Sequence, residues 1–336
     1  MTGAGAPGGP GIIKCLQKDS RIKLICCDID EYASGRFLND SFEHILPADH
    51  PEFIDSILEL CHRYQIDVVF PLVTRELFLF AKHKNRFESA QIKVIVSNEE
   101  ELFIANDKGK IHEHLKSNDL IHADFKITHE YNSLVRYVED FLSCYQKVCI
   151  KPTISNGSRG VRLIDDTVDQ FDILFNHKPN SLFTSKNDLL STLKGKDFPE
   201  LILSEVLEGE EFTVDTLIQN GKVLLVAPRI RSKMNAGISV AGEFIEEKAI
   251  IEQVHHISES LSLNGPIGFQ FKRNMNTDTF NLLEINPRIQ GTSVALIGAG
   301  VNLPTMAVYS ALGLDIQIPS IKWGTRFIRF YSEVYY

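Results

Sequence analysis

Short apolar runs alternate with an amphipathic segment over the first hundred residues. The runs at 23–30, 67–71 and 93–96 predict buried strands, and the first of them ends in acidic residues. Between the first two runs, the segment 51–64 has apolar residues at helical spacing. This alternation predicts an α/β fold with a parallel sheet over residues 1–100.

A second pattern lies near the C-terminus, where residues 268–272 and 282–288 predict two strands joined by the polar stretch 274–278. A turn centred on Thr277 sets the pairing. The predicted cross-strand pairs are Phe269 with Ile285, Phe271 with Leu283, and Gln270 with Glu284. One face is then apolar, and a slip of one residue would place both phenylalanines in water, so the register is strongly specified.

The other face of this predicted hairpin carries oxygen donors. Asn286 comes two residues after Glu284 and so points the same way, beside Gln270. Carboxylate and amide oxygens suit a hard cation such as Mg²⁺ next to phosphates. Pro287 ends the strand, and Arg288 adds a guanidinium group whose N–H donors suit phosphate oxygens. The alternative is an edge hairpin with a polar outer face.

Two lysines lie where the chain favours anions. Lys151 is on the predicted strand 148–152, and the small residues of 155–161 let backbone N–H groups approach a charge that this lysine also reaches. Lys108 follows Asp107, which is available to the first turn of a predicted helix. The alternative for 155–161 is an ordinary hairpin turn.

An acidic stretch joins two further predicted strands. The strand 201–207 runs into 208–215, and Gly209 breaks the chain between them. An exposed linker of this kind offers backbone C=O and N–H groups to a purine edge. Glu211 comes six residues after Glu205 and is placed to accept hydrogen bonds from a ribose. The alternative is a solvated acidic face.

The strand predicted at 223–227 leads to three alternating basic residues. If the strand continues, Arg229, Arg231 and Lys233 lie on one face of the sheet. The segment 165–199 mixes acids, Asn and Ser with short apolar runs. It predicts a mobile, partly helical stretch without chemistry.

Composition excludes several classes of protein. The length of 336 residues predicts two domains, and the apolar fraction of 43% and charged fraction of 24% are ordinary for a globular protein. A net charge of -9 without a basic run argues against nucleic-acid binding. No stretch reaches the roughly 18 to 20 apolar residues of a membrane span, and no signal peptide is apparent. Scattered cysteines and histidines show no metal or redox spacing, which predicts reduced thiols in a cytoplasmic protein.

The N-terminus carries a weak dinucleotide signal. Gly3, Gly5 and Gly8 have the spacing of a dinucleotide-binding turn, and Asp28 or Asp30 falls near the expected ribose-binding acid. The strand that should precede this turn is missing, so either the true start lies upstream or the domain lacks its first strand. We favour a structural turn and predict no NADH binding by this domain.

Five of these motifs, in this order, resemble the ATP-grasp superfamily. They are Lys108, Ile150-Lys151-Pro152 with its glycine-containing loop, Glu205 to Asp215, Gln270, and Glu284 to Arg288. The loop and the trio of Gln270, Glu284 and Asn286 look most like the large subunit of carbamoyl-phosphate synthetase and its single-module relatives. The likeness covers residues 106–313. Residues 1–100 resemble the domain that precedes the ATP-grasp module, where the glycine loop is not a dinucleotide site.

The resemblance implies an α/β chain with a Rossmann-like pre-ATP-grasp domain, followed by an ATP-grasp fold of two α+β subdomains. The implied boundaries are 1–105 for the first domain, 106–315 for the ATP-grasp domain with a lid subdomain at about 118–200, and 316–336 for a C-terminal strand segment.

The resemblance also implies ATP and Mg²⁺ (or Mn²⁺) as cofactors and gives residues their roles. By this likeness the ATP phosphates are bound by Lys108, Lys151, Ser155, Gly157 and Ser158, adenine is bound by the backbone of Glu205, Val206 and Leu207, and the ribose is bound by Glu211. The metal is bound by Gln270, Glu284 and Asn286. Arg288 contacts the transferring phosphoryl group, and Arg231 contacts an acyl-phosphate oxygen. One departure concerns the loop, because the family often has Gly-Ser-Gly-Ser-Arg-Gly where this chain has Asn156 before Gly157. Asn tolerates a left-handed backbone, so we expect the loop to fold over phosphate.

These parts predict an ATP-dependent ligase that activates a carboxylate as an acyl phosphate for attack by an amine or a similar nucleophile. The synthetase has two ATP-grasp modules and this chain has room for one, so carbamoyl phosphate synthesis is not expected. A kinase on the same fold would stop after phosphoryl transfer, and a dinucleotide-dependent oxidoreductase would depend on the glycine loop. The expected partners are small-molecule substrates, without nucleic acid or membrane, and a homodimer stays open.

Overall fold

The chain folds into two compact units. The computed structural model describes residues 1–155, 157, 159–177, 181–235 and 237–336. Unit 1 comprises Met1–Ala105, Glu211–Phe271 and Ile285–Tyr336, and unit 2 comprises Asn106–Glu210 and Lys272–Glu284.

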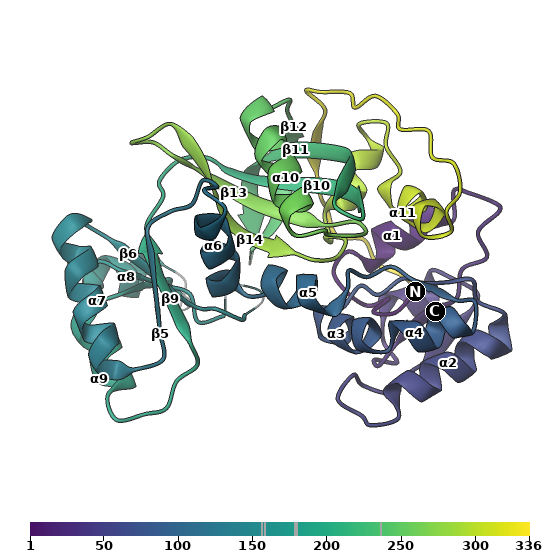
Figure 1. Cartoon of the computed structure of the whole chain (residues 1–336), viewed down its shortest axis with the longest axis horizontal. Coiled ribbons are helices and arrows are strands. Elements are labelled where there is room, and N and C mark those ends of the chain that lie inside the picture. Colours follow the sequence, from purple (N-terminus) through teal and green to yellow (C-terminus); the bar gives the residue numbers. More distant parts are fainter. Residues whose placement is uncertain (156, 158, 178–180, 236) are drawn as a thin grey trace. The chain divides into compact units, whose positions relative to one another are not determined.

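Two short pairs of parallel strands lie in the N-terminal part of unit 1, which is coloured purple to blue in Figure 1. Strand β1 (Cys26–Asp28) pairs in parallel with β2 (Phe42–His44), and β3 (Val68–Val69) pairs in parallel with β4 (Lys93–Val94). Thr2 joins the two pairs, because it forms parallel bridges with both Cys27 and Pro71. The accompanying helices are α1 (Gly9–Leu16), η1 (Ser34–Phe37), α2 (Phe53–Tyr64), α3 (Thr74–Lys82), α4 (Lys84–Ser89) and α5 (Glu99–Ala105).

The bridges of Thr2 correct one expectation from the sequence. We expected the strand before the glycine turn to be missing, whereas Thr2 occupies the position of that strand between β1 and the segment after β3. Its backbone N–H donates to the Phe70 carbonyl at 3.2 Å. A pattern of apolar residues cannot reveal so short a strand, because two or three residues give no periodicity.

The larger sheet has six strands, in the order β14-β13-β10-β11-β12-β15. Its strands are β10 (Glu211–Gln219), β11 (Lys222–Asn235), β12 (Ile238–Phe244), β13 (Gly268–Asn274), β14 (Thr279–Asn286) and β15 (Arg326–Ile328). Unit 1 adds α10 (Lys248–Ser260), η2 (Ser293–Ile297) and α11 (Leu303–Ala311). The apolar face of α10 is buried because Ile250, Val254 and Ile257 recur at helical spacing.

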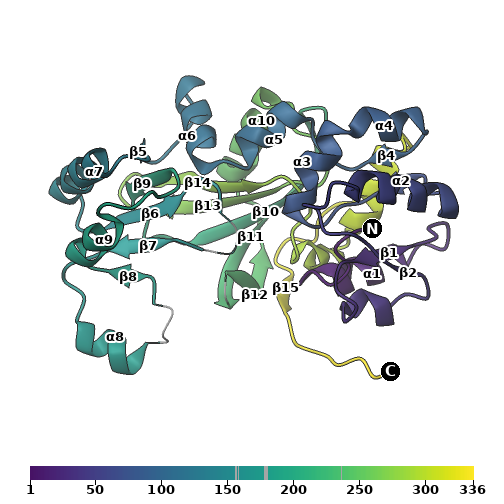
Figure 2. The same ribbon diagram turned by 90° about the horizontal axis from the view of Figure 1, so that it is seen from below.

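Unit 2 is an α+β layer. Its five-stranded sheet has the order β5-β9-β6-β7-β8, and α7 packs on β5, β9 and β6 (Figure 2). Leu134 and Val138 of α7 are fully buried against Val148, Ile150 and Leu203. The elements are α6 (Lys108–Ser117), β5 (Phe125–Thr128), α7 (Tyr131–Cys144), β6 (Val148–Pro152), β7 (Arg162–Ile164), α8 (Gln170–Asn176), β8 (Phe183–Thr184), α9 (Lys186–Leu193) and β9 (Leu201–Glu205).

The α/β class, the parallel N-terminal layer and the C-terminal strand pair are confirmed. Strand β11 runs on to Asn235, past the predicted end of its apolar run at Ala227. The strands β2, β5, β7, β8 and β12 and the helices α7, α10 and α11 were not predicted, whereas β15 lies within the predicted C-terminal strand segment 316–336. The domain boundaries drawn from the resemblance stay a prediction.

A buried carboxyl group lies in the N-terminal part of unit 1. Glu76, on α3, is 4% exposed, and its Oε2 accepts a hydrogen bond of 2.5 Å from the Thr2 hydroxyl. Burial raises the pKa of Glu76 to about 7, the Thr2 hydrogen bond and the N-terminal ammonium oppose this rise, and Asp28 adds to it. Since folding moves this pKa upward, ionisation of Glu76 opposes folding.

We predict that Glu76→Gln stabilises the protein at alkaline pH. Below about pH 4.5 the carboxyl group is protonated in both the folded and unfolded states; the wild type then loses stability as pH rises towards 7. The free energy of unfolding of the variant, relative to wild type, should rise by about 3 kcal/mol between pH 5 and pH 8. Urea titrations at both pH values measure it, with the exposed Glu88→Gln as control. An equal shift in both variants contradicts the prediction.

Candidate functional site

The hairpin of β13 and β14 presents the predicted polar residues. Phe269, Phe271 and Ile285 are buried, whereas Gln270 and Glu284 are half-buried. Asn286 is also half-buried and lies two residues after Glu284 on the same strand, so both side chains share one face. The predicted cross-strand register stays a prediction.

One detail of this hairpin differs from the expected pattern. Leu283 is only half-buried, whereas Leu282 is fully buried together with Asn281 and Phe280. Three consecutive buried residues show that both faces of β14 are covered there. Simple alternation therefore holds only for the last part of the strand.

Two buried lysines meet this strand within unit 2. Lys108 is 7% exposed and Lys151 is 8% exposed. Lys108 Nζ lies 3.5 Å from Glu284 Oε2 and donates a hydrogen bond of 2.8 Å to the Ser155 carbonyl. Lys151 Nζ donates to the Leu283 carbonyl at 3.3 Å. The fold thus brings Lys108, Lys151, Ser155 and Glu284 together from three separate segments, namely α6, β6 with the loop after it, and β14.

The charge balance of this group favours an anion. Burial lowers the pKa of Lys108, Glu284 opposes this effect, and Lys151 lowers the pKa further. The ammonium form of Lys108 is therefore disfavoured in this poorly hydrated place, although the Glu284 and Asp107 carboxylates both favour it. A polyanion such as a phosphate chain would relieve the repulsion between Lys108 and Lys151.

Local structure explains how Lys108 is held. The Asp107 side chain accepts hydrogen bonds from the N–H groups of Gly109 (2.8 Å) and Lys110 (3.1 Å), so it caps α6 as predicted. The Lys108 N–H donates to the Thr153 carbonyl at 2.8 Å. The start of α6 is therefore tied to the segment that follows β6.

The loop after β6 contains two glycines with positive φ. Gly157 has φ of 64° and Gly160 has φ of 76°. A Cβ at Gly160 would lie 2.7 Å from the Pro152 ring, so a larger residue is excluded there. The predicted phosphate ligand Ser158 and the neighbouring Asn156 lie outside the described residues.

The segment expected to read adenine follows β9. Val206 is half-buried and Leu207 is buried, and within the described part of the chain their backbone groups show no hydrogen bond to other residues. The Glu205 side chain accepts a long hydrogen bond of 3.4 Å from Asn274 Nδ2. Backbone donors and acceptors at 206 and 207 are therefore available to a ligand.

In unit 1, Arg231 connects two predicted ligands. Its Nη1 is paired with the Glu211 carboxylate and donates to Gln270 Oε1 at 3.2 Å. Its Nε donates to Ser239 Oγ at 3.0 Å. The resemblance implies separate roles for Arg231, Glu211 and Gln270, whereas the fold places Arg231 against both acceptors.

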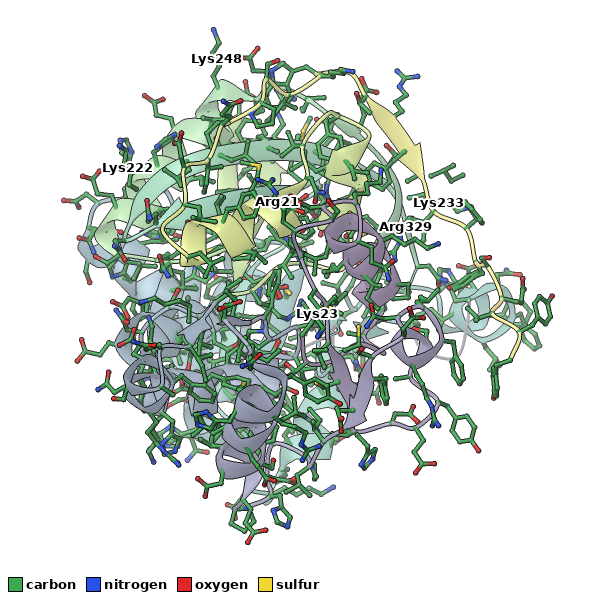
Figure 3. All side chains as sticks on the ribbon, turned by 90° about the vertical axis from the view of Figure 1, so that its right-hand side faces the viewer. Arg21, Lys23, Lys222, Lys233, Lys248 and Arg329 are labelled. Atoms are coloured by element: carbon green, nitrogen blue, oxygen red, sulfur yellow. The ribbon has the colours of Figure 1, made fainter. Side chains whose placement is uncertain are left out.

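The three cations predicted on one face have different environments. Arg229 is fully buried, and its Nε donates to Asp215 Oδ2 at 2.9 Å, while Ser293 Oγ donates to Asp215 Oδ1 at 2.5 Å. Lys233 is exposed and is labelled in Figure 3. A bulge between Arg231 and Lys233 also interrupts the regular alternation. The buried pair of Asp215 and Arg229 was missed, although a single acid within the apolar run of β10 was a signal for it.

Arg288 lies next to the N-terminal part of unit 1. Its Nε donates to Thr74 Oγ1 at 3.0 Å and its Nη1 donates to the Ile289 carbonyl at 2.9 Å. Thr74 carries no motif and was not predicted.

The glycine turn is packed against protein. A Cβ at Gly8, the residue before α1, would lie 2.3 Å from the Gly291 Cα, and the Gly5 N–H donates to Asp28 Oδ2 at 2.7 Å. The helix start and the acid that a dinucleotide would use therefore have contacts within the chain.

The described residues set two further limits on the site and on the class of protein. They contain no group of three or more His, Cys, Asp or Glu side chains that could hold a metal ion. The trio of Gln270, Glu284 and Asn286 is not of that type, because it contains one carboxylate. In the same part of the chain, no helix is both long enough and apolar enough to cross a membrane.

Solved structures share this fold. The biotin carboxylase domain dimer of Hydrogenobacter thermophilus 2-oxoglutarate carboxylase, in complex with MgADP, ADP and bicarbonate, has a TM-score of 0.68 at 15% identity and covers 94% of this chain and 70% of its own. N5-carboxyaminoimidazole synthetase from Staphylococcus aureus, complexed with ADP, has a TM-score of 0.66 at 16% identity, covering 94% and 77%. Rhizobium etli pyruvate carboxylase has a TM-score of 0.65 at 16% identity, and the match covers 92% of this chain but 28% of that one. The fold is therefore of the ATP-grasp class.

Two family models define the chain more closely. A model described as ATP-grasp in the biosynthetic pathway with Ter operon matches residues 197–327. A model described as the PylC-like N-terminal domain matches residues 5–95. The chain carries an ATP-grasp domain preceded by a PylC-like N-terminal domain. No curated protein matches it in sequence.

We predict that Asp215→Ala greatly destabilises unit 1. The substitution leaves the Arg229 guanidinium buried without its carboxylate, which typically costs about 3 to 5 kcal/mol of unfolding free energy. Urea unfolding followed by circular dichroism measures the change. The control is Glu243→Ala, which removes the acid of the exposed pair with Arg326 and should cost under about 1 kcal/mol. Similar losses in both variants would refute a structural role for the buried pair.

Proposed function

We propose that the protein is an ATP-dependent ligase that activates a carboxylate as an acyl phosphate, which an amine or a similar nucleophile then attacks. The products are ADP, phosphate and the joined molecule. The observation that carries this proposal is the group of Lys108, Lys151 and Glu284 in unit 2, where both lysines are buried and Lys108 lies 3.5 Å from the Glu284 carboxylate. The ATP-grasp fold and the ADP and MgADP in solved relatives support it.

We assign ATP recognition to three groups of residues. Lys108, Lys151, Ser155, Gly157 and Ser158 bind the phosphates, the backbone of Glu205, Val206 and Leu207 reads adenine, and Glu211 binds the ribose. In this structure Glu211 is paired with Arg231. The ribose hydroxyls therefore compete with, or share, that carboxylate.

The metal assigned to this reaction is Mg²⁺ (or Mn²⁺), held by Gln270, Glu284 and Asn286. The donor set fits, because hard oxygen atoms from one carboxylate and two amides suit Mg²⁺ together with phosphate oxygens. When bound, the ion neutralises charge on the phosphates. Lys108 now lies beside Glu284, and this contact stabilises the carboxylate when no cation is there.

The reaction needs positioning and charge stabilisation more than covalent chemistry from the protein. The substrate carboxylate attacks the γ-phosphorus, and the bond to ADP breaks. Lys151, Lys108 and Arg288 are assigned to the oxygens on which negative charge rises during this step. The nucleophile then forms a bond to the acyl carbon while phosphate leaves with the electron pair. Arg231 is assigned to an acyl-phosphate oxygen.

A kinase on the same fold is the second candidate. It would use the same ATP-binding residues and release a phosphorylated product without free phosphate. The proposal also includes small-molecule substrates and a homodimer. The proposed domain boundaries are 1–105, 106–315 and 316–336. A solved relative forms a dimer of its biotin carboxylase domain.

The test is a screen of carboxylate and amine pairs with MgATP, in which ADP and phosphate are measured and the product is identified by mass spectrometry. A ligase releases both and forms a new C–N bond, whereas a kinase keeps the phosphoryl group on its product. Glu284→Gln should abolish turnover and weaken MgATP binding, because an anionic ligand becomes neutral. The exposed Asp278→Asn, on the same hairpin, should keep both.

Two results would overturn the proposal. The first is wild-type activity in Glu284→Gln. The second is micromolar NADH binding without MgATP binding in titrations of the full chain, which would favour the oxidoreductase.

Lys151→Met should lower kcat more than it raises the KM for ATP. Its ammonium is assigned to oxygens whose charge rises as the bond to ADP breaks, so its contribution is made chiefly in the transition state. Loss of one such donor typically costs roughly 3 kcal/mol, or about a hundredfold in rate. Steady-state kinetics at saturating acceptor measures both constants.

The control is Lys147→Met on the same segment, where the lysine is paired with Asp165 and Glu208. We expect its kcat to stay within about threefold of wild type, since Lys147 has no assigned contact with ATP or the acceptor. A raised KM with unchanged kcat in Lys151→Met would assign this lysine to ground-state binding instead.

A further inference from the structure

The contact between Thr74 and Arg288 joins two distant parts of unit 1. Arg288 Nε donates to Thr74 Oγ1 at 3.0 Å, across 214 residues of sequence. Arg288 Nη1 donates to the Ile289 carbonyl at 2.9 Å. A guanidinium group is planar and rigid, so two anchors on different nitrogens fix its plane as well as its position.

The hydroxyl of Thr74 is not needed to begin its helix. Helix α3 starts at Thr74, its N-cap is Val73, and no side chain caps its first turn. Threonine usually stabilises a helix from the N-cap position itself, where its oxygen accepts a backbone N–H. Here the threonine comes one residue later, and its oxygen accepts from Arg288 instead.

Thr74 also lies at a place where α/β sheets bind ligands. Thr2 forms parallel bridges with Cys27 on one side and with Pro71 on the other. Along the chain, the strands on the Cys27 side come first and those on the Pro71 side come afterwards, so the strand order reverses at Thr2. Ligands of open α/β folds bind outside the carboxyl ends of the strands at such a switch point. Helix α3 begins three residues after Pro71.

We propose that Thr74 is a positioning residue for the reaction, and that it holds the Arg288 guanidinium in the orientation required by the transferring phosphoryl group. The N-terminal domain then takes part in catalysis through this contact. The proposal rests on the role assigned to Arg288 in the proposed function. A shift of a fraction of an ångström in a charge-stabilising group is enough to reduce the rate.

The test compares Thr74→Val with Thr74→Ser in the full chain, with ADP formation from MgATP as the measurement. Valine keeps the shape of threonine and removes the acceptor, so kcat should fall about tenfold, while the KM for ATP changes less than twofold. Serine keeps the hydroxyl and should restore kcat to within about twofold of wild type. Melting curves of both variants exclude a loss of folding as the cause.

Two controls separate positioning from general packing. Thr325→Val, also in unit 1, removes a hydroxyl that donates only to the nearby Lys322 carbonyl at 2.6 Å and should leave kcat unchanged. In an Arg288→Lys background, Thr74→Val should cause no further loss, because lysine lacks the Nε–H that Thr74 accepts.

The outcomes are distinguishable. Wild-type kcat in Thr74→Val, equal losses with serine and valine, or an undiminished loss in the Arg288→Lys background would overturn the proposal for Thr74 alone. If the unaltered protein neither binds MgATP nor forms ADP, the proposed function is overturned, and the role of Thr74 in it as well.

Discussion

The contacts of β14 with two buried lysines are the constraint on which the candidate site depends. Burying a lysine is costly unless a carboxylate or polar oxygens compensate its charge. Lys108 has Glu284 and the Ser155 carbonyl, and Lys151 has the Leu283 carbonyl. Because β14 supplies both Glu284 and Leu283, the position of this strand sets the position of both cations. The start of α6 and the loop after β6 are held in turn by contacts with these lysines.

The arginines of unit 1 follow the same principle. Arg231 is held by Glu211, Gln270 and Ser239, and Arg288 by Thr74 and Ile289. Each of these cations has protein acceptors, and at least one acceptor comes from another segment of the chain. Substrate binding in such a site exchanges protein contacts for ligand contacts, so the charges are placed before the substrate arrives.

The sequence predicted the fold best where a pattern extended over many residues. Helix α2 and the strands β1, β3 and β4 followed from the pattern of apolar residues, and Asp107 was identified as the cap of α6. The prediction of a missing first strand was wrong, because Thr2 forms bridges on both sides without any periodic signal. The grouping of Arg229 with Arg231 and Lys233 was also too simple. Whether a cation on a strand is buried against an acid or exposed depends on the elements packed around that strand. The sequence of the strand itself does not contain this information.

By itself, the sequence determined the α/β class, the order of the motifs and the residue types suited to ATP and Mg²⁺, because these depend on local periodicity and on side-chain chemistry. The tertiary structure alone decided the partners. It paired Lys108 with Glu284, placed Arg231 against Glu211 and Gln270, buried Arg229 with Asp215 and brought Thr74 to Arg288. These contacts join residues 14 to 214 positions apart. Contacts of this kind depend on how strands are ordered and packed, and a single sequence carries no local signal for that order.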